Sequence, residues 1–367
     1  MPFLIDLALI LGGILILFGG GELFVAGSTA VALLLGIPQI VIGLTVVSLG
    51  TSAPELFVSF FSTLKGEDAI AVSNIVGSNI FNVLVVLGMS ALVMPLRVRS
   101  RLVRRDVPLL LGVSMATWGM ASGGRLTWQA GLALLAGTVM NVIWEMRTAG
   151  ENPDEQGDDL SDERSSAPVA LARLAAGLVL LVVGSQLLVR GATGAALALG
   201  VSQTVIGLTI VAAGTSMPEL VTSLVAAYRG KADLAIGNVV GSNLLNQLVI
   251  LGLCASVSGD GLLVDPVMIN RDFPIMVLTT IACLPIFWTQ GVISRLEGGI
   301  LVGLYGLYLG EQLLLNQAPT FVEVYRLALL TLALPLLLAF LTWSVLHWRQ
   351  QRRRGPEAAL PKGTGSL

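Results

Sequence analysis

The sequence predicts an all-α polytopic membrane protein made of two inverted-topology five-helix repeats and one extra C-terminal transmembrane helix, about 11 spans in all. Three observations predict this fold: the composition, an internal repeat and the placement of the basic residues. Of the 367 residues, 54% are hydrophobic and only 12% are charged, about half the charged fraction of a soluble domain. Apolar runs of about 20 residues recur, which is the length a helix needs to cross the hydrocarbon core of a bilayer.

The apolar stretches between polar breaks are the expected spanning helices. They lie at 3–26, 38–64, 69–94, 107–122, 126–146, 169–190, 202–228, 233–257, 272–290, 296–315 and 325–347. The longest break, "RTAGENPDEQGDDLSDERSSAP", is rich in Asp and Glu. Because it has few apolar residues to bury, we expect a solvated linker there.

These stretches divide the chain into five parts. The parts are a first five-helix repeat at 1–147, an acidic cytoplasmic linker at 148–168, a second, inverted five-helix repeat at 169–316, an extra transmembrane helix at 317–348 and a basic cytoplasmic tail at 349–367. The motifs that carry the chemistry lie at 36–88 in the first repeat and at 200–252 in the second.

The internal repeat is visible without gaps. A shift of 164 residues lays Gly36–Gly88 over Gly200–Gly252, and 27 of the 53 pairs are identical. The two copies are five spans apart, and since five is odd they cross the membrane in opposite directions. Inverted repeats of this kind are a common plan of secondary transporters, whose substrate site lies where the halves meet.

The basic residues predict the orientation of the chain. If the N-terminus is outside and all eleven stretches span, 16 of the 21 Lys and Arg residues face the cytoplasm. Such a bias follows the positive-inside rule. We therefore expect a multi-pass protein of the cell (inner) membrane with its N-terminus outside and its C-terminus in the cytoplasm.

Several other classes of protein are disfavoured. Cys254 and Cys283 both lie in apolar stretches and predict no disulfide framework, and His347 is the only histidine, which disfavours zinc sites built on His and Cys. No Walker A motif is present, which disfavours an ATP-driven pump. An intramembrane enzyme would need a histidine base or a metal-binding pair within a span, so we expect no enzyme and no cofactor.

Polar residues interrupt the second and seventh stretches in the same way. "GTSAPEL" begins at Gly50, and Pro54 within it has no N–H, so a helix loosens at this point. Thr51 and Ser52 lie four and three residues before Glu55, on the same side of a helix. "GTSMPEL" repeats the pattern with Thr215, Ser216 and Glu219.

The following stretch of each copy adds a polar stripe. Asn74, Ser78 and Asn82 recur every four residues, as do Asn238, Ser242 and Asn246. Such residues can hold helices together, and the neighbouring Gly77 and Gly241 favour close helix approach. The alternative is that they line a binding site, and for the serines and for Asn82 and Asn246 we favour this reading.

Every candidate ligand in these motifs is an oxygen atom, which suits hard cations such as Ca²⁺ and Na⁺. Two converging glutamates in a bilayer would repel each other unless a cation or a proton neutralised them. Glu55 and Glu219 together supply a charge of −2, which one Ca²⁺ or two Na⁺ would neutralise. Two ions that share ligands exclude each other, and this is the physical basis of antiport.

The chain resembles the cation/calcium exchanger (CaCA) superfamily, on its prokaryotic sodium/calcium-exchanger-like branch. "GLTVVSLGTSAPEL" with "SNIVGSNIFN" and "GLTIVAAGTSMPEL" with "GNVVGSNLLN" carry the resemblance. It implies alternating access and exchange of Ca²⁺ for Na⁺ or H⁺. It also implies ion ligands at Thr51, Ser52, Glu55, Ser78, Asn82, Thr215, Ser216, Glu219, Ser242 and Asn246, with the backbone carbonyls of Ser48 and Ala212 for Na⁺.

Two departures from the family pattern leave alternatives open. Some relatives carry an acid at a position matching Asn82 or Asn246, whereas both are amides here, so the coupling ion and stoichiometry are open. The extra helix lies beyond the ten-helix plan. A Ca²⁺/H⁺ or K⁺-dependent Na⁺/Ca²⁺ exchanger and a non-transporting cation sensor are the alternatives. The expected partners are the lipid bilayer and inorganic cations, with no nucleic acid and no obligatory protein partner, so a monomer is expected.

Overall fold

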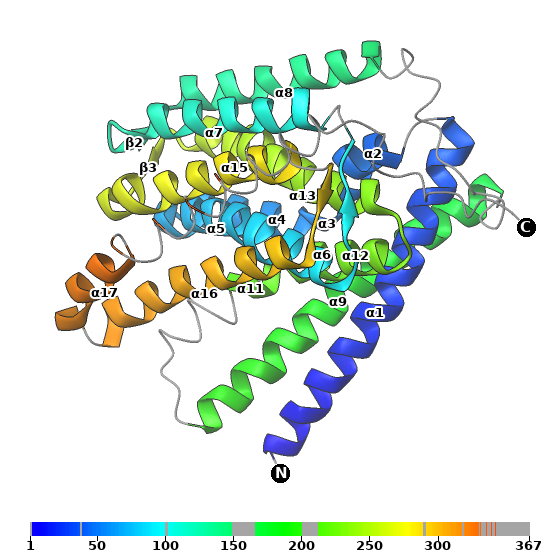
Figure 1. The fold of residues 1–367 in the computed structure, drawn as a ribbon, viewed down its shortest axis with the longest axis horizontal. Coiled ribbons are helices and arrows are strands. Elements are labelled where there is room, and N and C mark those ends of the chain that lie inside the picture. Colours follow the sequence, from blue (N-terminus) through cyan, green and yellow to red (C-terminus); the bar gives the residue numbers. More distant parts are fainter. Residues whose placement is uncertain are drawn as a thin grey trace, which may run out of the picture.

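The computed structural model describes most of both repeats. The described residues are 2–36, 39–99, 102–148, 166–199, 212–288, 291–317 and 319–329, and the single residues 331, 335, 339 and 342. The acidic linker except its ends, the basic tail and most of the expected helix at 325–347 lie outside them. Within this part the structure is almost entirely helical (Figure 1).

The described part of the first half contains eleven helical elements. They are α1 (Pro2–Leu35), α2 (Gln39–Ile42), η1 (Gly43–Val47), α3 (Ser48–Thr51), α4 (Ala53–Leu64), α5 (Asp68–Phe81), η2 (Asn82–Leu87), α6 (Gly88–Val93), η3 (Leu102–Asp106), α7 (Val107–Ala121) and α8 (Trp128–Thr148). The elements η1, η2 and η3 are π-helical and continue directly into the α-helix that follows each of them.

The second half mirrors the first. Its helices are α9 (Ala167–Ala198), α11 (Ala212–Thr215), α12 (Met217–Tyr228), α13 (Ala232–Leu245), η7 (Asn246–Leu251), α14 (Gly252–Val257), η8 (Met268–Asp272), α15 (Phe273–Trp288), α16 (Arg295–Gln317), η9 (Pro319–Phe321) and α17 (Val322–Ala328). The elements α4, α5, η2 and α6 coincide with α12, α13, η7 and α14 under the 164-residue shift, so the repeated sequence folds into repeated structure.

Length and apolarity of the helices support a membrane protein. Among the described residues, six helices are long and apolar enough to cross a membrane, or seven if the bent pair Ile40–Thr51 and Ala53–Leu64 is one span. The two central spans, 68–93 and 232–257, are the most buried of these. The remaining spans surround them and expose many large apolar side chains, as expected for surfaces that face lipid.

Two short antiparallel strand pairs join the halves. Strand β1 (Leu96–Arg97) pairs with β4 (Val292–Ile293), and β2 (Arg125–Leu126) pairs with β3 (Leu262–Leu263). Each pair therefore takes one strand from each half of the chain.

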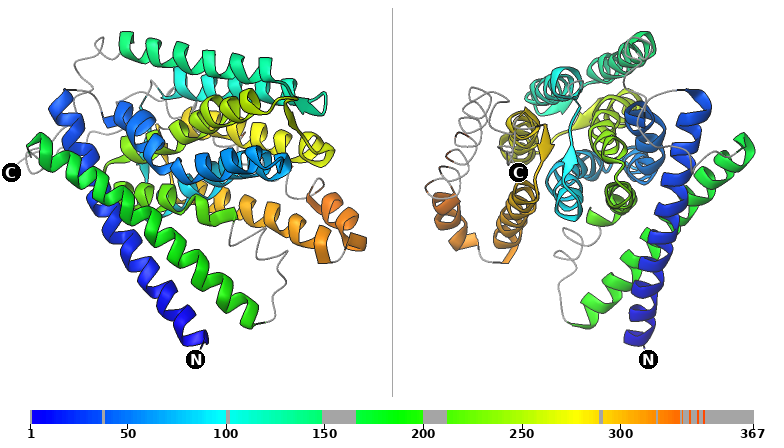
Figure 2. Two further views of the ribbon diagram at one scale, coloured as in Figure 1. Left: turned by 180° about the vertical axis from the view of Figure 1, so that it is seen from behind. Right: turned by 45° about the vertical axis from the view of Figure 1, so that its right-hand side comes forward.

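Helices α1 and α9 form a long pair at one side of the bundle (Figures 1 and 2). Glycines at seven-residue spacing line their contact, and they are Gly13, Gly20 and Gly27 on α1 and Gly177, Gly184 and Gly191 on α9. A Cβ atom added at Gly20 would lie 2.8 Å from Leu180 Cβ and 2.9 Å from the backbone nitrogen of Leu181. The two backbones are thus in direct contact.

The predicted ends of these two helices were wrong. The stretches expected at 3–26 and 169–190 continue to Leu35 and Ala198. On α1, the Ser28 and Thr29 hydroxyls bond back to the carbonyl oxygens of Phe24 and Val25 at 2.7 and 2.9 Å. Because their polar atoms are satisfied within the helix, they do not end it. Helix α1 instead ends before Gly36, whose φ of +65° suits glycine.

Candidate functional site

The predicted helix breaks are present at the two acidic motifs. Ser52, at φ −80° and ψ 7°, separates α3 from α4, and the two parts of the span meet at a bend of 49°. Pro54 then lies in the first turn of α4, where a missing N–H does no harm. Glu55 lies in the same turn, near the positive end of the helix dipole.

The second copy has the same local geometry. Ser216 has φ −89° and ψ 10°, Pro218 is in the first turn of α12, and Glu219 follows it. The repeat therefore places two carboxylates at the N-terminal ends of two helices. Both Glu55 and Glu219 are fully buried, with 0% of each residue exposed.

Hydroxyl groups of each repeat reach the carboxylate of the other. Ser216 Oγ donates to Glu55 Oε1 at 2.8 Å, and Ser52 Oγ donates to Glu219 Oε1 at 3.1 Å. Ser78 Oγ lies 3.4 Å from Glu55 Oε1 and 3.2 Å from Ser216 Oγ. The two acidic motifs, 164 residues apart in sequence, thus form one site.

Asn74 and Asn238 hold this site together. The Asn238 amide donates to Ser223 Oγ at 2.9 Å and to the backbone oxygen of Glu219 at 3.3 Å, while its Oδ1 accepts from Thr51 at 3.0 Å. Asn74 makes the corresponding contacts with Ser59, Glu55 and Thr215. Both amides are used for connecting helices, so the geometry favours the structural reading of these two asparagines.

Asn79 and Asn243 also belong to the interface between the repeats, although they are not among the residues predicted from the sequence. Asn82 Nδ2 donates to Asn243 Oδ1, and Asn246 Nδ2 donates to Asn79 Oδ1, both at 3.1 Å. These bonds again join one repeat to the other. Asn79 and Asn243 directly follow the predicted ligands Ser78 and Ser242, and their identity in both copies of "GSN" was the available signal.

Five of the predicted ligands each have a buried oxygen atom with no hydrogen-bond partner among the described residues. They are Glu55 Oε2, Glu219 Oε2, Asn82 Oδ1, Asn246 Oδ1 and Ser242 Oγ. Thr222 Oγ1 on α12 and Gln247 Oε1 on η7 are also unpartnered in this part of the chain. Buried polar atoms in folded proteins are almost always paired, so such a cluster of orphaned oxygens fits a site for a hard cation.

The two predicted backbone ligands are placed less decisively. The carbonyl oxygen of Ser48 accepts the N–H of Ser52 at 2.9 Å and lies 3.4 Å from Thr51 Oγ1. Ala212 is the first residue of α11. Their role in Na⁺ binding stays a prediction.

A cavity of about 460 Å³ adjoins the site. Asn74, Ser78 and Thr215 line one part of it, and Arg271 and Asp272 of η8 line another.

The two glycines of the polar stripes differ. A Cβ atom at Gly241 would lie 2.6 Å from Leu44 Cα, so this glycine permits close helix approach as predicted. For Gly77 it stays a prediction: no atom of the described residues would come within 4 Å of its Cβ, and Leu208, the repeat mate of Leu44, lies outside the described residues.

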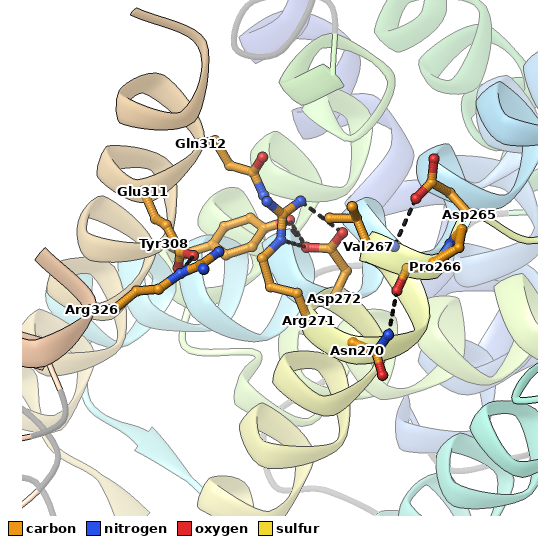
Figure 3. A network of polar contacts seen from close by, with 10 residues as sticks. All are labelled: Asp265, Pro266, Val267, Asn270, Arg271, Asp272, Tyr308, Glu311, Gln312 and Arg326. Carbon is orange, nitrogen blue, oxygen red and sulfur yellow. Dashed lines mark hydrogen bonds and ion pairs between the residues drawn. The ribbon is translucent and has the colours of Figure 1, made fainter. Parts of the chain in front are cut away.

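A polar network surrounds the Asp272 carboxylate (Figure 3). Arg271 donates to Asp272 from Nε and Nη2, each at 2.9 Å. From α16, Tyr308 OH lies 3.1 Å and Gln312 Nε2 3.4 Å from Asp272 Oδ1. The charge of Asp272 is therefore balanced by Arg271, and the carboxylate ties η8 to α16.

The fold and the site together define a polytopic, all-helical membrane protein with a buried oxygen-rich site between two inverted repeats. This is the architecture of a secondary transporter. The profile of the sodium/calcium exchanger protein family matches residues 5–144 and 169–314. The chain belongs to this family.

Individual relatives agree with the family match. The inner membrane protein YrbG of Escherichia coli is 34% identical over 318 residues, covering 83% of this chain and 97% of the relative. The sodium/calcium exchanger MaX1 of Methanosarcina acetivorans is 31% identical over 343 residues, covering 83% and 97%. Among solved structures, the sodium-calcium exchanger NCX_Mj superposes with a TM-score of 0.72 at 29% identity, covering 84% of this chain and 98% of that one.

Proposed function

We propose that this protein exchanges Ca²⁺ for Na⁺ across the membrane by alternating access, and that Glu55 and Glu219 bind both ions. The observation that carries the proposal is the cluster of five unpartnered, buried oxygens described above. The sodium/calcium exchangers MaX1 and NCX_Mj, whose likeness extends over most of this chain, support the choice of ions.

The charge of the site explains why the two ions would compete. Two buried carboxylates without a counter-ion are costly in a bilayer, and no Lys or Arg lies in the two motif breaks. One Ca²⁺ or two Na⁺ would neutralise Glu55 and Glu219, and a third Na⁺ would leave a charge of +1. Exchange of three Na⁺ for one Ca²⁺ would therefore carry net charge.

The ten side chains predicted as ligands would have different roles in binding the ions. The carboxylates supply charge, and Asn82, Asn246 and Ser242 supply neutral oxygens. Ca²⁺ takes six to eight oxygen ligands, so the hydroxyls of Ser52, Ser78, Thr51, Thr215 and Ser216 complete the set in one or both ionic states. Neither the Ca²⁺-bound state nor the Na⁺-bound state needs all ten ligands at once.

The proposal extends to the setting of the protein. The chain is a multi-pass membrane protein, and we place it in the inner membrane with its N-terminus outside. A single chain supplies both carboxylates, so a monomer is sufficient for transport.

Reconstitution into liposomes tests the proposed function. We expect ⁴⁵Ca²⁺ uptake into Na⁺-loaded vesicles diluted into Na⁺-free medium, with K⁺ equal on both sides and a membrane current in parallel. Uptake driven by a pH gradient without Na⁺ would instead identify a Ca²⁺/H⁺ exchanger, and a requirement for K⁺ would identify the K⁺-dependent type.

Glu55→Gln and Glu219→Gln serve as the paired loss-of-function variants. Each should abolish Na⁺-driven uptake while the protein still inserts and purifies. Ca²⁺ binding without any gradient-driven flux in the wild-type protein would identify a cation sensor and overturn the proposal.

A further inference from the structure

We propose that Asn79 and Asn243 are positioning residues that hold Asn246 and Asn82 with their carbonyl oxygens turned toward the ions. The inference rests on the proposed function, because it concerns how two ligands of that site are oriented. Neither Asn79 nor Asn243 is among the predicted ligands.

A backbone carbonyl can only accept a hydrogen bond. Asn79 Nδ2 lies 3.4 Å from the backbone oxygen of Asn243. The amide of Asn79 must therefore present its nitrogen to that oxygen, and this choice fixes the position of its own Oδ1.

The orientation of Asn79 in turn determines the orientation of the Asn246 amide. Asn79 Oδ1 can also only accept, and it lies 3.1 Å from the side chain of Asn246. Asn246 must present its Nδ2 to that oxygen. Its Oδ1 is then turned the other way and has no partner among the described residues.

The inverted repeat supplies an independent second instance. Asn243 Nδ2 donates to the backbone oxygen of Asn79 at 3.1 Å, and Asn243 Oδ1 accepts from Asn82 Nδ2 at 3.1 Å. Asn82 Oδ1 is likewise left without a partner. Two separate backbone carbonyls thus impose the same polarity on two separate ligands.

Because the four asparagine amides are buried, their orientations are strongly constrained. Asn79, Asn82 and Asn246 are 0% exposed and Asn243 is 1% exposed. Water cannot substitute for a mismatched partner there, and a buried donor that faces a donor loses its hydrogen bond. A flipped Asn246 amide would set its oxygen against Asn79 Oδ1 and turn an N–H group toward a cation.

These hydrogen bonds also explain why amides occur at positions 82 and 246. A carboxylate at position 246 would place an acceptor opposite the acceptor Asn79 Oδ1. Asn79 and Asn243 thus favour neutral oxygens at 246 and 82 and leave the charge of the site to the two glutamates.

A double-mutant cycle separates orientation from simple packing, because residues in one network are non-additive and independent ones add. Asn79→Leu removes the acceptor, and Asn246→Ala removes the oriented oxygen. We expect Asn79→Leu alone to raise the KM for Ca²⁺ about fivefold to tenfold, the loss of about one hydrogen bond, with little change in the maximal rate. In the Asn246→Ala background, Asn79→Leu should have no further effect on KM.

The matched control uses Ser52 in place of Asn246. Asn79 and Ser52 share no hydrogen-bond partner in the described structure, since Ser52 Oγ donates to Glu219, so Asn79→Leu and Ser52→Ala should have additive effects. Additivity in the Asn246 cycle, or an Asn79→Leu variant with unchanged KM, would overturn the proposal. A wild-type protein that fails to exchange Ca²⁺ would instead overturn the proposed function.

If Asn79→Leu does not purify as a monodisperse protein, Asn79→Ala deletes the same amide without a branched side chain. ⁴⁵Ca²⁺ binding to the purified protein in detergent then replaces transport as the readout. The same non-additivity with Asn246→Ala is expected.

Discussion

The hydroxyl of Ser216 donates a hydrogen bond of 2.8 Å to Glu55, although the two residues belong to different repeats. The inverted mate of this contact, from Ser52 to Glu219, measures 3.1 Å. Each carboxylate is therefore fixed by the opposite half of the molecule. Relative movement of the halves would disturb both contacts, so under the proposed function ion binding and conformation would be linked.

Removal of these hydroxyls should weaken Ca²⁺ binding. Ser216→Ala deletes a donor to a buried carboxylate and a candidate ligand, and a hydrogen bond to a charged group contributes about 1.5–3 kcal/mol. We expect the KM for Ca²⁺ uptake to rise by at least about tenfold, and Ser52→Ala to behave alike. Ser28→Ala is the control, because Ser28 Oγ donates within its own helix, to the backbone oxygen of Phe24. Equal KM values for Ser216→Ala and Ser28→Ala would contradict the assignment.

The sequence was sufficient to predict the two helix breaks and the meeting of the two acidic motifs, whereas the roles of their residues as ion ligands stay predictions. The spacing of Thr51, Ser52 and Glu55 predicted one side of a single helix, and the repeat supplied their mates. In the structure the helix breaks at Ser52, whose hydroxyl donates to Glu219 of the other repeat. The helix break could be predicted from Pro54 alone, because proline has no N–H group to donate. These inferences depend on local geometry, which a sequence specifies well.

Contacts between the repeats could not be predicted in the same way. The bond from Asn246 to Asn79 depends on how far one helix is shifted along another, and no residue spacing encodes that shift. The π-helical turn that begins at Asn82 has no sequence signal either. The seven-residue spacing of Gly13, Gly20 and Gly27 is visible in the sequence, but the spacing alone does not identify α9 as the facing helix.

The α1–α9 contact should be intolerant of even one methyl group at Gly20. A Cβ atom there would lie 2.9 Å from a backbone nitrogen of the facing helix, and overpacking of this kind costs about 1–3 kcal/mol. Gly20→Ala should lower the thermal unfolding temperature of the purified protein. Gly19→Ala is a matched control on the same helix, since no described atom lies within 4 Å of its Cβ. A lower unfolding temperature for Gly19→Ala than for Gly20→Ala would argue against the backbone contact.

The Asp272 carboxylate should be needed for stability. In Asp272→Asn the Arg271 guanidinium loses its balancing charge while only 17% of its side chain is exposed. Breaking a buried ion pair by removing one partner costs about 3–5 kcal/mol. Thermal unfolding of the purified variant measures this effect. Glu323→Gln is the comparison, because Glu323 is 82% exposed in its pair with Arg326 and surface pairs contribute at most about 1 kcal/mol. The idea fails if the two variants unfold at the same temperature.

Ca²⁺ should stabilise the folded protein through the two glutamates. A ligand that binds only the folded state at about 100 times its Kd adds about 2.7 kcal/mol to the free energy of unfolding. We therefore expect the unfolding temperature of the purified protein to rise with added Ca²⁺ and to fall again with a chelator. In Glu55→Gln or Glu219→Gln the rise should be small, because one of the two charges that attract the cation is missing, while the unfolding temperature without Ca²⁺ should not fall, because the repulsion between two carboxylates is also removed. A Ca²⁺-dependent rise of equal size in both variants and the wild-type protein would place the ion elsewhere.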